Sequence, residues 1–485
     1  MNIISLFIIP FIAIINLFFI NKTREIALNK IALFWSLSQF VMFSIFIVHY
    51  QNTTSFQYSY LLFWVKKIGL FSSWGNTIFV IDGISLFFIG LSILLIPICI
   101  LISWRAIDKL KKEFLIALFS VLILLMGVFT ILDLLGFYIL FETILIPMFL
   151  IIGVWGSREE KIKAAYYFFF YTLIGSLLML ISIFKIYSLT GTTNYYTLLN
   201  LEIPKYLQYW LFIGFFASLA VKIPMFPVHI WLPQAHVEAP ISGSVLLAGI
   251  LLKLGGYGFI RFSNPLFPLA SEFFTPVIIT LSIIAIVYGA FTTCRQTDIK
   301  RLIAYSSVSH MGLVTLAIFV HSLEGLIASV IMMLAHGLVS SGLFMTSATL
   351  YTRFHTRAIK YFKGLTTSMP LLSVITFLLL LGNISFPGTL NFIAEFFSLF
   401  VGTKYSFITG LGICFGIILG TVYSLYMYNR IYFGTTSRSL IYIRDLSSFE
   451  YNSFLPLVFL TIFLGIFPGY IISPLTIGSL INISL

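Results

Sequence analysis

The sequence predicts an all-α polytopic membrane protein with about 14 transmembrane helices. The first observation is composition: of 485 residues, 60% are hydrophobic and only 9% are charged, which suits a protein surrounded by lipid. The second is that the apolar residues gather into runs of roughly 18 to 25, the length of a helix that crosses a bilayer. Because no stretch between the runs is long enough to bury its own core, we expect one transmembrane domain, residues 1–485.

Each predicted span is justified by its own apolar run. The first run, Ile3 to Ile20, lacks a basic start and a small-residue cleavage site, so we expect a transmembrane helix and not a removed signal. The longest connection, about Tyr50 to Ile78, is expected to be a loop. In chain order, the spans are expected near 3–20, 31–48, 79–103, 114–132, 134–155, 165–187, 208–230, 241–260, 276–294, 302–320, 325–350, 371–400, 408–431 and 454–473.

The basic residues support this series of spans. Most of the 28 Lys and Arg fall in loops that follow odd-numbered helices, for example Lys109, Arg295 and Arg357. Short loops rich in Lys and Arg stay on the side of synthesis, so we expect these loops on that side and both termini on the other. Since orientation in the bilayer also explains the net charge of +12, we expect no nucleic-acid partner.

Two spans contain helix-breaking residues. The seventh carries K-I-P-M-F-P (222–227) and the twelfth carries G-N-I-S-F-P-G (382–388). Pro removes a backbone donor and Gly relaxes a helix, so each span is expected to divide into two half-helices. Five crossings separate the two, so they run in opposite directions, as in inverted repeats whose broken helices mark a transport site. The expected grouping is helices 1 to 3 within 1–103, repeat one (helices 4 to 8) within 114–260, repeat two (helices 9 to 13) within 276–431, and helix 14 within 454–473.

Charged residues inside the spans point to function. A Lys or Glu at mid-span costs roughly 2.5 to 3.5 kcal/mol on insertion scales, so such residues usually face a polar interior. A lysine near a helix end can instead snorkel, and a Glu–Lys pair can be a static pin between helices. A pin needs only two residues, whereas this chain supplies a series. Its members are Glu142 in the fifth span, Lys222 at the break of the seventh, Lys253 in the eighth and Glu395 in the twelfth.

Histidines extend this series. His310 lies in the tenth span, His336 in the eleventh, and His229 and His236 flank the end of the seventh. Neutral imidazole can pass protons near physiological pH. A lone membrane histidine is more often a satisfied polar contact, but serines beside His310 and His336 could hold water. These two are therefore candidates for proton transfer.

Together these residues predict a proton relay. Burial disfavours the charged form of a lysine and a nearby carboxylate favours it, so moving the carboxylate moves the proton. We expect Glu142 and Lys222 to form a switchable pair and Lys253 to be the central relay. The group expected to carry the proton to the opposite side is His310, His336 and Glu395.

Metal and cofactor sites are not expected in this chain. Cys99, Cys294 and Cys414 are far apart and none belongs to a C-x-x-C pair. His229 and His236 do not have the spacing of metal ligands. The G-G-Y-G-F segment after Lys253 lies inside an apolar helix with no strand before it, so close helix packing explains it better than phosphate binding.

One motif carries a family resemblance. The segment V-K-I-P-M-F-P-V-H-I-W-L-P-Q-A-H-V-E-A-P, followed by L-L-K-L-G-G-Y-G, resembles the antiporter-like membrane subunits of NADH:ubiquinone oxidoreductase (respiratory complex I). The resemblance extends through R-Q-T-D-I-K-R-L-I-A-Y-S-S-V-S-H-M-G, A-H-G-L and N-F-I-A-E-F, and it covers helices 4 to 13. Glu395, where subunits 2 and 5 typically have Lys, favours the subunit 4 group. The N-terminal third shares only general character.

The resemblance implies a fourteen-helix proton-translocating subunit of the mitochondrial inner membrane, with the six relay positions on a hydrated axis. It implies that NAD, FMN, iron-sulfur clusters and ubiquinone are bound elsewhere in the complex and none by this chain. The implied partners are the other membrane subunits, especially the neighbouring antiporter-like subunits. Membrane lipids, with cardiolipin as a candidate, are expected near the basic loops.

Two other functions remain open from the sequence. The chain could be a subunit of a multi-subunit sodium/proton antiporter, which looks similar across the same helices, or a passive structural spacer. Co-isolation with flavin and iron-sulfur subunits would separate the first from the respiratory complex. A spacer should tolerate neutral substitution of at least some intramembrane charges.

Overall fold

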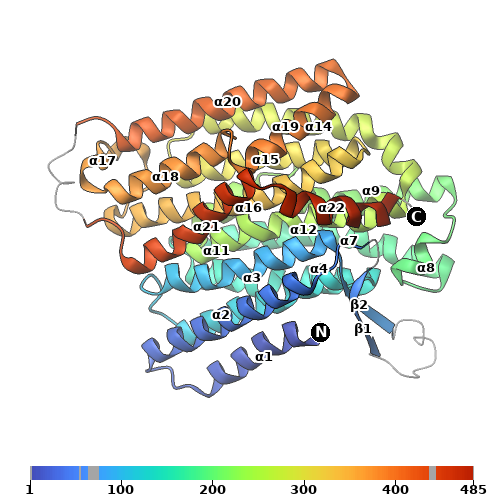
Figure 1. The fold of residues 1–485 in the computed structure, drawn as a ribbon, viewed down its shortest axis with the longest axis horizontal. Coiled ribbons are helices and arrows are strands. Elements are labelled where there is room, and N and C mark those ends of the chain that lie inside the picture. The colour runs from blue at the N-terminus through green and yellow to red at the C-terminus, as the bar shows by residue number, and fades with distance from the viewer. Residues whose placement is uncertain (1–2, 54–55, 64–75, 436–443, 484–485) are drawn as a thin grey trace.

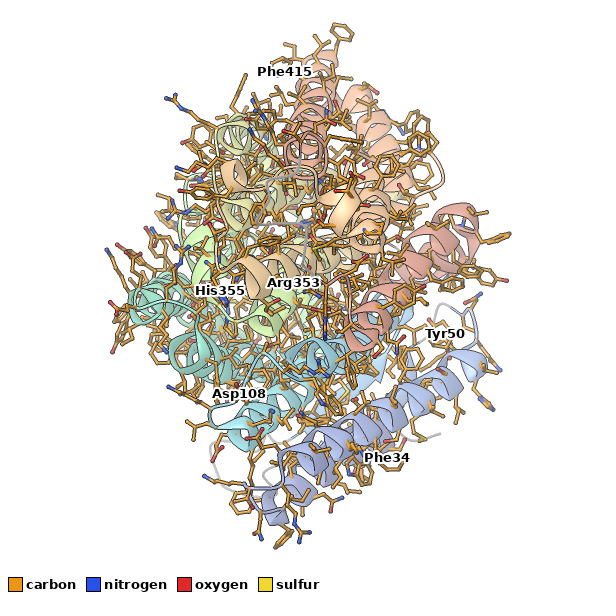
Figure 2. The ribbon with its side chains drawn as sticks, turned by 90° about the vertical axis from the view of Figure 1, so that its left-hand side faces the viewer. Phe34, Tyr50, Asp108, Arg353, His355 and Phe415 are labelled. Carbon is orange, nitrogen blue, oxygen red and sulfur yellow. The ribbon has the colours of Figure 1, made fainter. Side chains whose placement is uncertain are left out.

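The computed structural model describes residues 3–53, 56–63, 76–435 and 444–483; Lys66, Lys67 and Arg438, which the sequence places in loops, lie outside these ranges. The helices lie side by side in one packed body and run between the left and right ends of Figure 1. Seen along the helices, the body extends from Phe34 on α2 at one edge to Phe415 on α20 at the other (Figure 2).

The elements follow the chain in three groups. The first is α1 (Ile4–Phe19), α2 (Glu25–His49), β1 (Gln57–Phe63), β2 (Asn76–Ile81) and α3 (Gly83–Ser103). The second is α4 (Lys111–Thr130), α5 (Leu134–Thr143), α6 (Leu145–Trp155), α7 (Lys161–Thr190), α8 (Tyr195–Leu199), α9 (Lys205–Lys222), α10 (Trp231–Glu238), α11 (Ile241–Leu246), η2 (Leu247–Leu251), α12 (Leu252–Gly258), η3 (Phe259–Ser263) and α13 (Asn264–Leu266). The third is α14 (Pro268–Cys294), α15 (Ile299–Phe319), α16 (Leu323–Phe354), η4 (Ile359–Tyr361), α17 (Leu365–Ser368), α18 (Pro370–Asn383), α19 (Leu390–Tyr405), α20 (Phe407–Tyr432), α21 (Ser448–Ile466) and α22 (Gly469–Ile483).

The prediction of a largely helical membrane protein is confirmed. Within the described residues, 11 helices are long and apolar enough to cross a membrane, and α1 and α18 are shorter apolar helices. The window of α16 is 94% buried inside the protein, whereas that of α21 is 22% buried. Helix α16 is therefore enclosed by protein, whereas α21 exposes most of its surface to the surroundings.

A β-hairpin replaces part of the expected loop and the start of the third expected helix. β1 and β2 pair antiparallel, with Leu61 opposite Ile78, and Phe79 also bridges to Ile131. The segment N-T-I-F-V-I of β2 is rich in β-branched residues, which favour strands. The third helix consequently begins at Gly83, where the Asp82 side chain accepts from the Ser85 N–H as an N-cap.

Two helix boundaries also differ from the predicted spans. The expected helix 134–155 consists of α5 and α6, which meet at Ile144, because Pro147 cannot donate to the carbonyl of Thr143. The expected last helix, 454–473, is observed as α21, and a further helix, α22, follows it. Pro468 separates these two helices, since proline disfavours the helical conformation in the residue before it.

Both predicted helix breaks are present and share one local geometry. The first lies between α9 and α10, and the second lies between α18 and α19. In the first, the Met225 N–H donates to the Ala220 carbonyl at 2.9 Å; in the second, the Phe386 N–H donates to the Leu381 carbonyl at 2.9 Å. In each break, the donor is the third residue after the end of the helix. Its acceptor lies five residues earlier in the chain, instead of the four that are usual in an α-helix.

In a second pair of matched contacts, the two contacts join residues at nearly the same separation along the chain. The Leu134 N–H donates to the Thr193 carbonyl at 2.9 Å, and the Ile299 N–H donates to the Arg357 carbonyl at 3.1 Å. The first contact lies just before α8 and the second shortly before α17, and these two helices stand at opposite ends of the body (Figure 1). Inverted repeats would produce this arrangement, which supports the predicted repeats.

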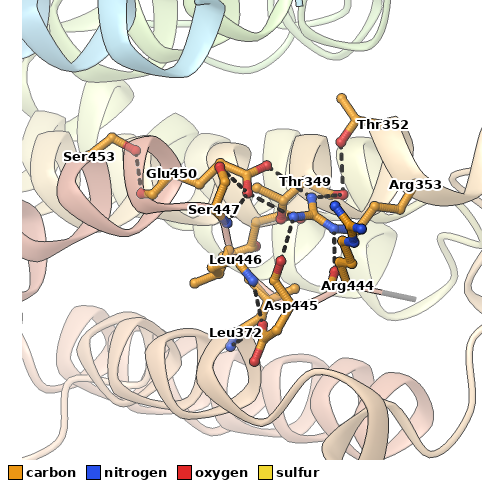
Figure 3. Close-up of polar contacts among 11 residues, drawn as sticks. Thr349, Thr352, Arg353, Leu372, Arg444, Asp445, Leu446, Ser447, Glu450 and Ser453 are labelled. Carbon is orange, nitrogen blue, oxygen red and sulfur yellow. Dashed lines mark hydrogen bonds and ion pairs between the residues drawn. The ribbon is translucent and has the colours of Figure 1, made fainter. Parts of the chain in front are cut away.

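At the left end of Figure 1, α16 is tied to the C-terminal helices by a salt bridge. Arg353 donates to both carboxylate oxygens of Glu450, at 2.9 and 2.7 Å, and also to the carbonyls of Arg444 and Asp445 at 3.0 Å (Figure 3). The Asp445 carboxylate in turn accepts from the Leu371 N–H at 2.7 Å, in the first turn of α18. These contacts hold α16, α18 and α21 together at the end of the body that carries the basic loops, which we call the basic end.

Candidate functional site

Lys222 is the last residue of α9 and is only 4% exposed. Its ammonium lies 4.2 Å from the centroid of the Phe141 ring and donates to the Phe141 carbonyl at 3.5 Å. Across the break, the Trp231 indole N–H donates to the Val221 carbonyl at 3.0 Å. That bond satisfies a carbonyl that the broken helix leaves without its usual backbone donor.

Glu142 approaches Lys222 from the end of α5 and is partly buried. Both residues lie in the described part of the chain, and no direct ion pair joins them, although their charges interact and Glu142 contacts Ser176 of α7. Glu142 Oε1 is buried and has no hydrogen-bond partner among the described residues. The pair is therefore close enough to couple, and small movements can change its strength.

Lys253 lies in α12 and is fully buried. Its Nζ is 2.9 Å from Nδ1 of His336 on α16, and it also donates to the Ala248 carbonyl. The π-helical segments η2 and η3 flank α12 on both sides. Such segments often occur at functional sites because they shift the helix register.

The glycines beside Lys253 let α12 pack closely between two helices. A Cβ on Gly255 would lie 2.7 Å from the Leu219 carbonyl of α9, and a Cβ on Gly256 would lie 2.4 Å from Met333 of α16. The expected packing role of G-G-Y-G-F is confirmed. Close packing against α9, whose last residue is Lys222, places Lys253 on a neighbouring element.

His310 on α15 joins His336 to Glu395. The ring centroids of His310 and His336 are 5.6 Å apart, and His310 Nδ1 is 3.4 Å from Glu395 Oε1 on α19. His310 Nε2 lies 3.2 Å from Asn383 Oδ1, and the Asn383 amide donates to Ser424 of α20 at 3.0 Å. Asn383 and Glu395 come from α18 and α19, the two helices that flank the second break.

The six predicted residues thus form two groups. Lys253, His336, His310 and Glu395 follow one another in a buried row, and Glu142 and Lys222 form a separate pair. Among the described residues, no hydrogen bond or ion pair joins Lys222 to Lys253. Transfer between the groups would need water or movement.

Sequence reasoning missed Asn383 as a site residue. Asn383 is the last residue of α18, in the position that Lys222 occupies at the end of α9. Its place in G-N-I-S-F-P-G, matched to K-I-P-M-F-P, was the available signal. Tyr423 of α20, 1% exposed, also interacts with Asn383 and Glu395 and had no signal in the sequence.

His236, predicted only to flank the seventh span, lies near the row. It is fully buried and stacks on Phe344 with ring centroids 4.4 Å apart. It lies within electrostatic range of Lys253 and Lys300. His229, in contrast, lies between Phe226, with centroids 5.7 Å apart, and Tyr288, at 6.1 Å.

Three basic residues in loops or near helix ends are buried, which the sequence did not indicate. Arg261 is 1% exposed and pairs with Asp82 inside the protein. Lys300 and Arg357 are 5% and 4% exposed; Lys300 donates to the Ala239 carbonyl at 2.7 Å, and Arg357 donates to the Val237 carbonyl. The latter two satisfy carbonyls at the end of α10, which a helix terminus leaves without backbone partners.

The described residues contain no group of three or more His, Cys, Asp and Glu side chains placed to hold a metal ion. The site consists of titratable groups at short separations inside a membrane domain. Such an arrangement is suited to moving protons between side chains.

Comparisons with known proteins place this chain in a family. A family model described as NADH:quinone oxidoreductase/Mrp antiporter, TM, matches residues 131–420. The NADH-ubiquinone oxidoreductase chain 4 of Metridium senile is 54% identical over 469 residues, which cover 97% of this chain and 96% of that one.

Solved structures share the fold. A chain of respiratory complex I from Thermus thermophilus with bound NADH matches with a TM-score of 0.87 and 27% identity, covering 98% of both chains. A chain of the Mrp complex from Dietzia sp. DQ12-45-1b matches with a TM-score of 0.84 and 16% identity, covering 98% of this chain and 96% of that one. The second likeness is one of fold alone.

Proposed function

The chain belongs to the family of NADH-ubiquinone oxidoreductase chain 4, and we propose that its six buried or partly buried relay residues translocate protons for that enzyme. It is a multi-pass inner-membrane protein and a subunit of the oxidoreductase. The redox reaction belongs to other subunits. The membrane implied by the relatives is the mitochondrial inner membrane.

The observation that carries the proposal is the buried row from Lys253 to Glu395. Lys253 is 0% exposed, and its ammonium can donate a proton to Nδ1 of His336 across 2.9 Å. The next imidazole, that of His310, is within 5.6 Å between centroids. A water that bridges one nitrogen of each ring would complete the connection.

Asn383 fixes which nitrogen of His310 can accept the proton. With Nε2–H donating to Asn383 Oδ1 at 3.2 Å, Nδ1 of neutral His310 is left as the acceptor. A proton that arrives at Nδ1 would then face Glu395 Oε1 at 3.4 Å. Glu395 is the last member of the row, so its carboxylate would receive the proton.

The Glu142–Lys222 pair would control the other end of the path. A charged Lys222 is favoured when the Glu142 carboxylate is near and disfavoured when it moves away. The helix break after Lys222 leaves room for such movement without bending a continuous helix. The two inverted five-helix repeats, which the matched contacts support, would give each half of the path a broken helix.

The test is a comparison of NADH-driven proton uptake with quinone reduction in sealed vesicles that contain the purified complex with Lys253→Met. Methionine keeps the volume and removes the titratable group, so we expect fewer protons per electron in an assembled complex. Lys404→Met is the matched control, because Lys404 is an exposed lysine at the end of α19. Normal pumping in an assembled Lys253→Met complex would contradict the proposal.

The other parts of the complex are proposed on the same basis. NAD, FMN, iron-sulfur clusters and ubiquinone would be held by other subunits, and NADH is bound in the Thermus thermophilus complex. Neighbouring antiporter-like subunits are the expected direct partners. Cardiolipin at the basic end is a further candidate ligand.

A subunit of a sodium/proton antiporter remains the second candidate function, because a chain of the Mrp complex has the same fold as this chain. Its identity of 16% is far below the 54% of the oxidoreductase relative. Isolation with flavin and iron-sulfur subunits would exclude it. The passive spacer would be supported instead if neutral substitutions along the row left pumping unchanged.

A further inference from the structure

A buried ion pair lies outside the relay row. Arg261 in η3 and Asp82, the N-cap of α3, are each 1% exposed, and the guanidinium donates to the carboxylate. The guanidinium also lies 5.7 Å from the centroid of Tyr257 and 5.4 Å from that of Phe56. The side chains of Tyr195 and Tyr257 both interact with it. Arg261 therefore has aromatic and hydroxyl groups around it as well as its carboxylate.

This pair lies along the helix that carries Lys253. Lys253, Tyr257 and Arg261 follow one another at intervals of four residues, which places them along one side of the helix. Eight residues advance about 12 Å along a helix axis. Arg261 thus lies two turns from the central lysine of the proposed relay, toward the end of the helix.

A pocket of 340 Å³ approaches the same end from outside. Its lining includes Tyr195, Ile260, Asn264, His321 and Ser322, which come from segments between α7 and α9, between α12 and α14, and after α15. All three segments follow even-numbered predicted helices and so lie opposite the basic loops. Tyr195 lines the pocket and also interacts with Arg261, so the guanidinium lies one side chain behind the pocket lining, on the helix that carries Lys253.

The chemistry of arginine makes it a barrier on a route from the pocket to Lys253. A chain of proton transfers needs groups that both accept and donate, as water and tyrosine hydroxyls do. Arginine only donates and stays charged in proteins. The Asp82 carboxylate holds this cation in place and compensates its charge inside the protein.

We propose that Arg261, positioned by Asp82, seals the end of the proton path opposite the basic loops against passive back-flow. Without the seal, water in the pocket could connect through Tyr195 and Tyr257 to Lys253, and the proton gradient would discharge through this chain. The inference rests on the proposed function, because it takes Lys253 to lie on the proton path.

The experiment measures passive proton permeability in sealed vesicles that contain the purified complex. No NADH is added, valinomycin with potassium clamps the membrane potential, and a pH-sensitive dye follows the decay of an imposed pH gradient. The variant is Asp82→Asn/Arg261→Gln, which neutralises both partners and leaves no unpaired buried charge. We expect the gradient to decay several-fold faster than in the unmutated complex.

The control variant is Arg353→Gln/Glu450→Gln, which neutralises the salt bridge at the opposite end (Figure 3). It should leave the decay unchanged, because this pair does not lie on the route from the pocket. Arg261→Lys is a milder second variant. It keeps a cation beside Asp82 but can lose and accept a proton, so it should also leak.

Adding Lys253→Met to the neutralised Asp82/Arg261 pair tests whether the leak uses the relay. The leak should fall back toward the unmutated rate, which a general loosening of the structure would not do. An assembled complex of either Arg261 variant without a faster decay would overturn the seal, and so would a leak that persists with Lys253→Met. Failure of the proposed function shows separately, as normal NADH-driven pumping by Lys253→Met alone.

Discussion

At the scale of single residues, the site is distinguished by titratable side chains that contact one another. Lys253 is fully buried, His336 and Glu395 are 2% and 5% exposed, and His310 lies between them. A buried polar group is expensive unless it has a partner. Here the partners are themselves able to take up or release protons, which is the property that a static pin does not require.

Asn383 is expected to matter for proton transfer although it does not titrate. Asn383→Leu keeps the size of the side chain but removes the acceptor for His310 Nε2. His310 could then adopt either neutral tautomer, so we expect clearly slower proton translocation with the complex still assembled. The measurement is the initial rate of NADH-driven proton uptake.

Ser424→Ala is the graded control for Asn383→Leu. It removes only the hydroxyl that accepts from the Asn383 amide at 3.0 Å, so His310 keeps its contact. The loss of rate should be smaller than that of Asn383→Leu. Equal rates in both variants and the unmutated complex would show that the tautomer of His310 does not limit transfer.

At the scale of elements, irregular helices position the site. Lys222 ends α9 at a proline-containing break, Asn383 ends α18 at the second break, and Lys253 lies between two π-helical segments. Irregular backbone at membrane depth is tolerated only where protein or water satisfies its polar groups. The irregular positions therefore coincide with the places where polar side chains and water can enter.

The indole of Trp231 is expected to stabilise the first break. Trp231→Phe removes the N–H that donates to the Val221 carbonyl and leaves that buried carbonyl unpaired. We expect a loss of about 1–3 kcal/mol in the free energy of unfolding. Thermal unfolding of the purified complex measures it.

Trp210→Phe provides the comparison for Trp231→Phe, because Trp210 lies on the same helix as Val221 but is 72% exposed. Its midpoint temperature should stay close to that of the unmutated complex. If both variants unfolded at the same temperature, the indole bond would have no measurable part in holding the break.

At the scale of the whole molecule, the C-terminal helices are fastened to the second predicted repeat at the basic end. Arg353 forms two bonds to Glu450 and two to carbonyls of the preceding segment. Both side chains of the salt bridge are less than one-fifth exposed. The contact thus links α16, whose row residue is His336, to the outer helix α21.

Arg353→Ala should loosen α21 from the body. The substitution leaves Glu450 partly buried without its cation, which costs on the order of 3 kcal/mol. Hydrogen–deuterium exchange of residues 448–466 should rise, with little change in α4. The exposed Lys363→Ala is the control, and unchanged exchange in Arg353→Ala would show that apolar packing alone holds α21.

The sequence by itself determined the membrane class, most of the spans, both helix breaks and the burial of its relay candidates. These properties are local: apolar runs of bilayer length, prolines and glycines inside them, and charges that are costly in lipid can each be read from neighbouring residues. The family resemblance rests on the same contiguous motifs.

Only the tertiary structure decided which side chains meet. The contact of Asn383 with His310, the pairing of Arg261 with Asp82 and the burial of Lys300 all join segments distant in the chain. A basic residue near the end of an apolar run looks the same in sequence whether it faces water or a buried carboxylate. Its partner is set by how the helices pack, which no local pattern encodes.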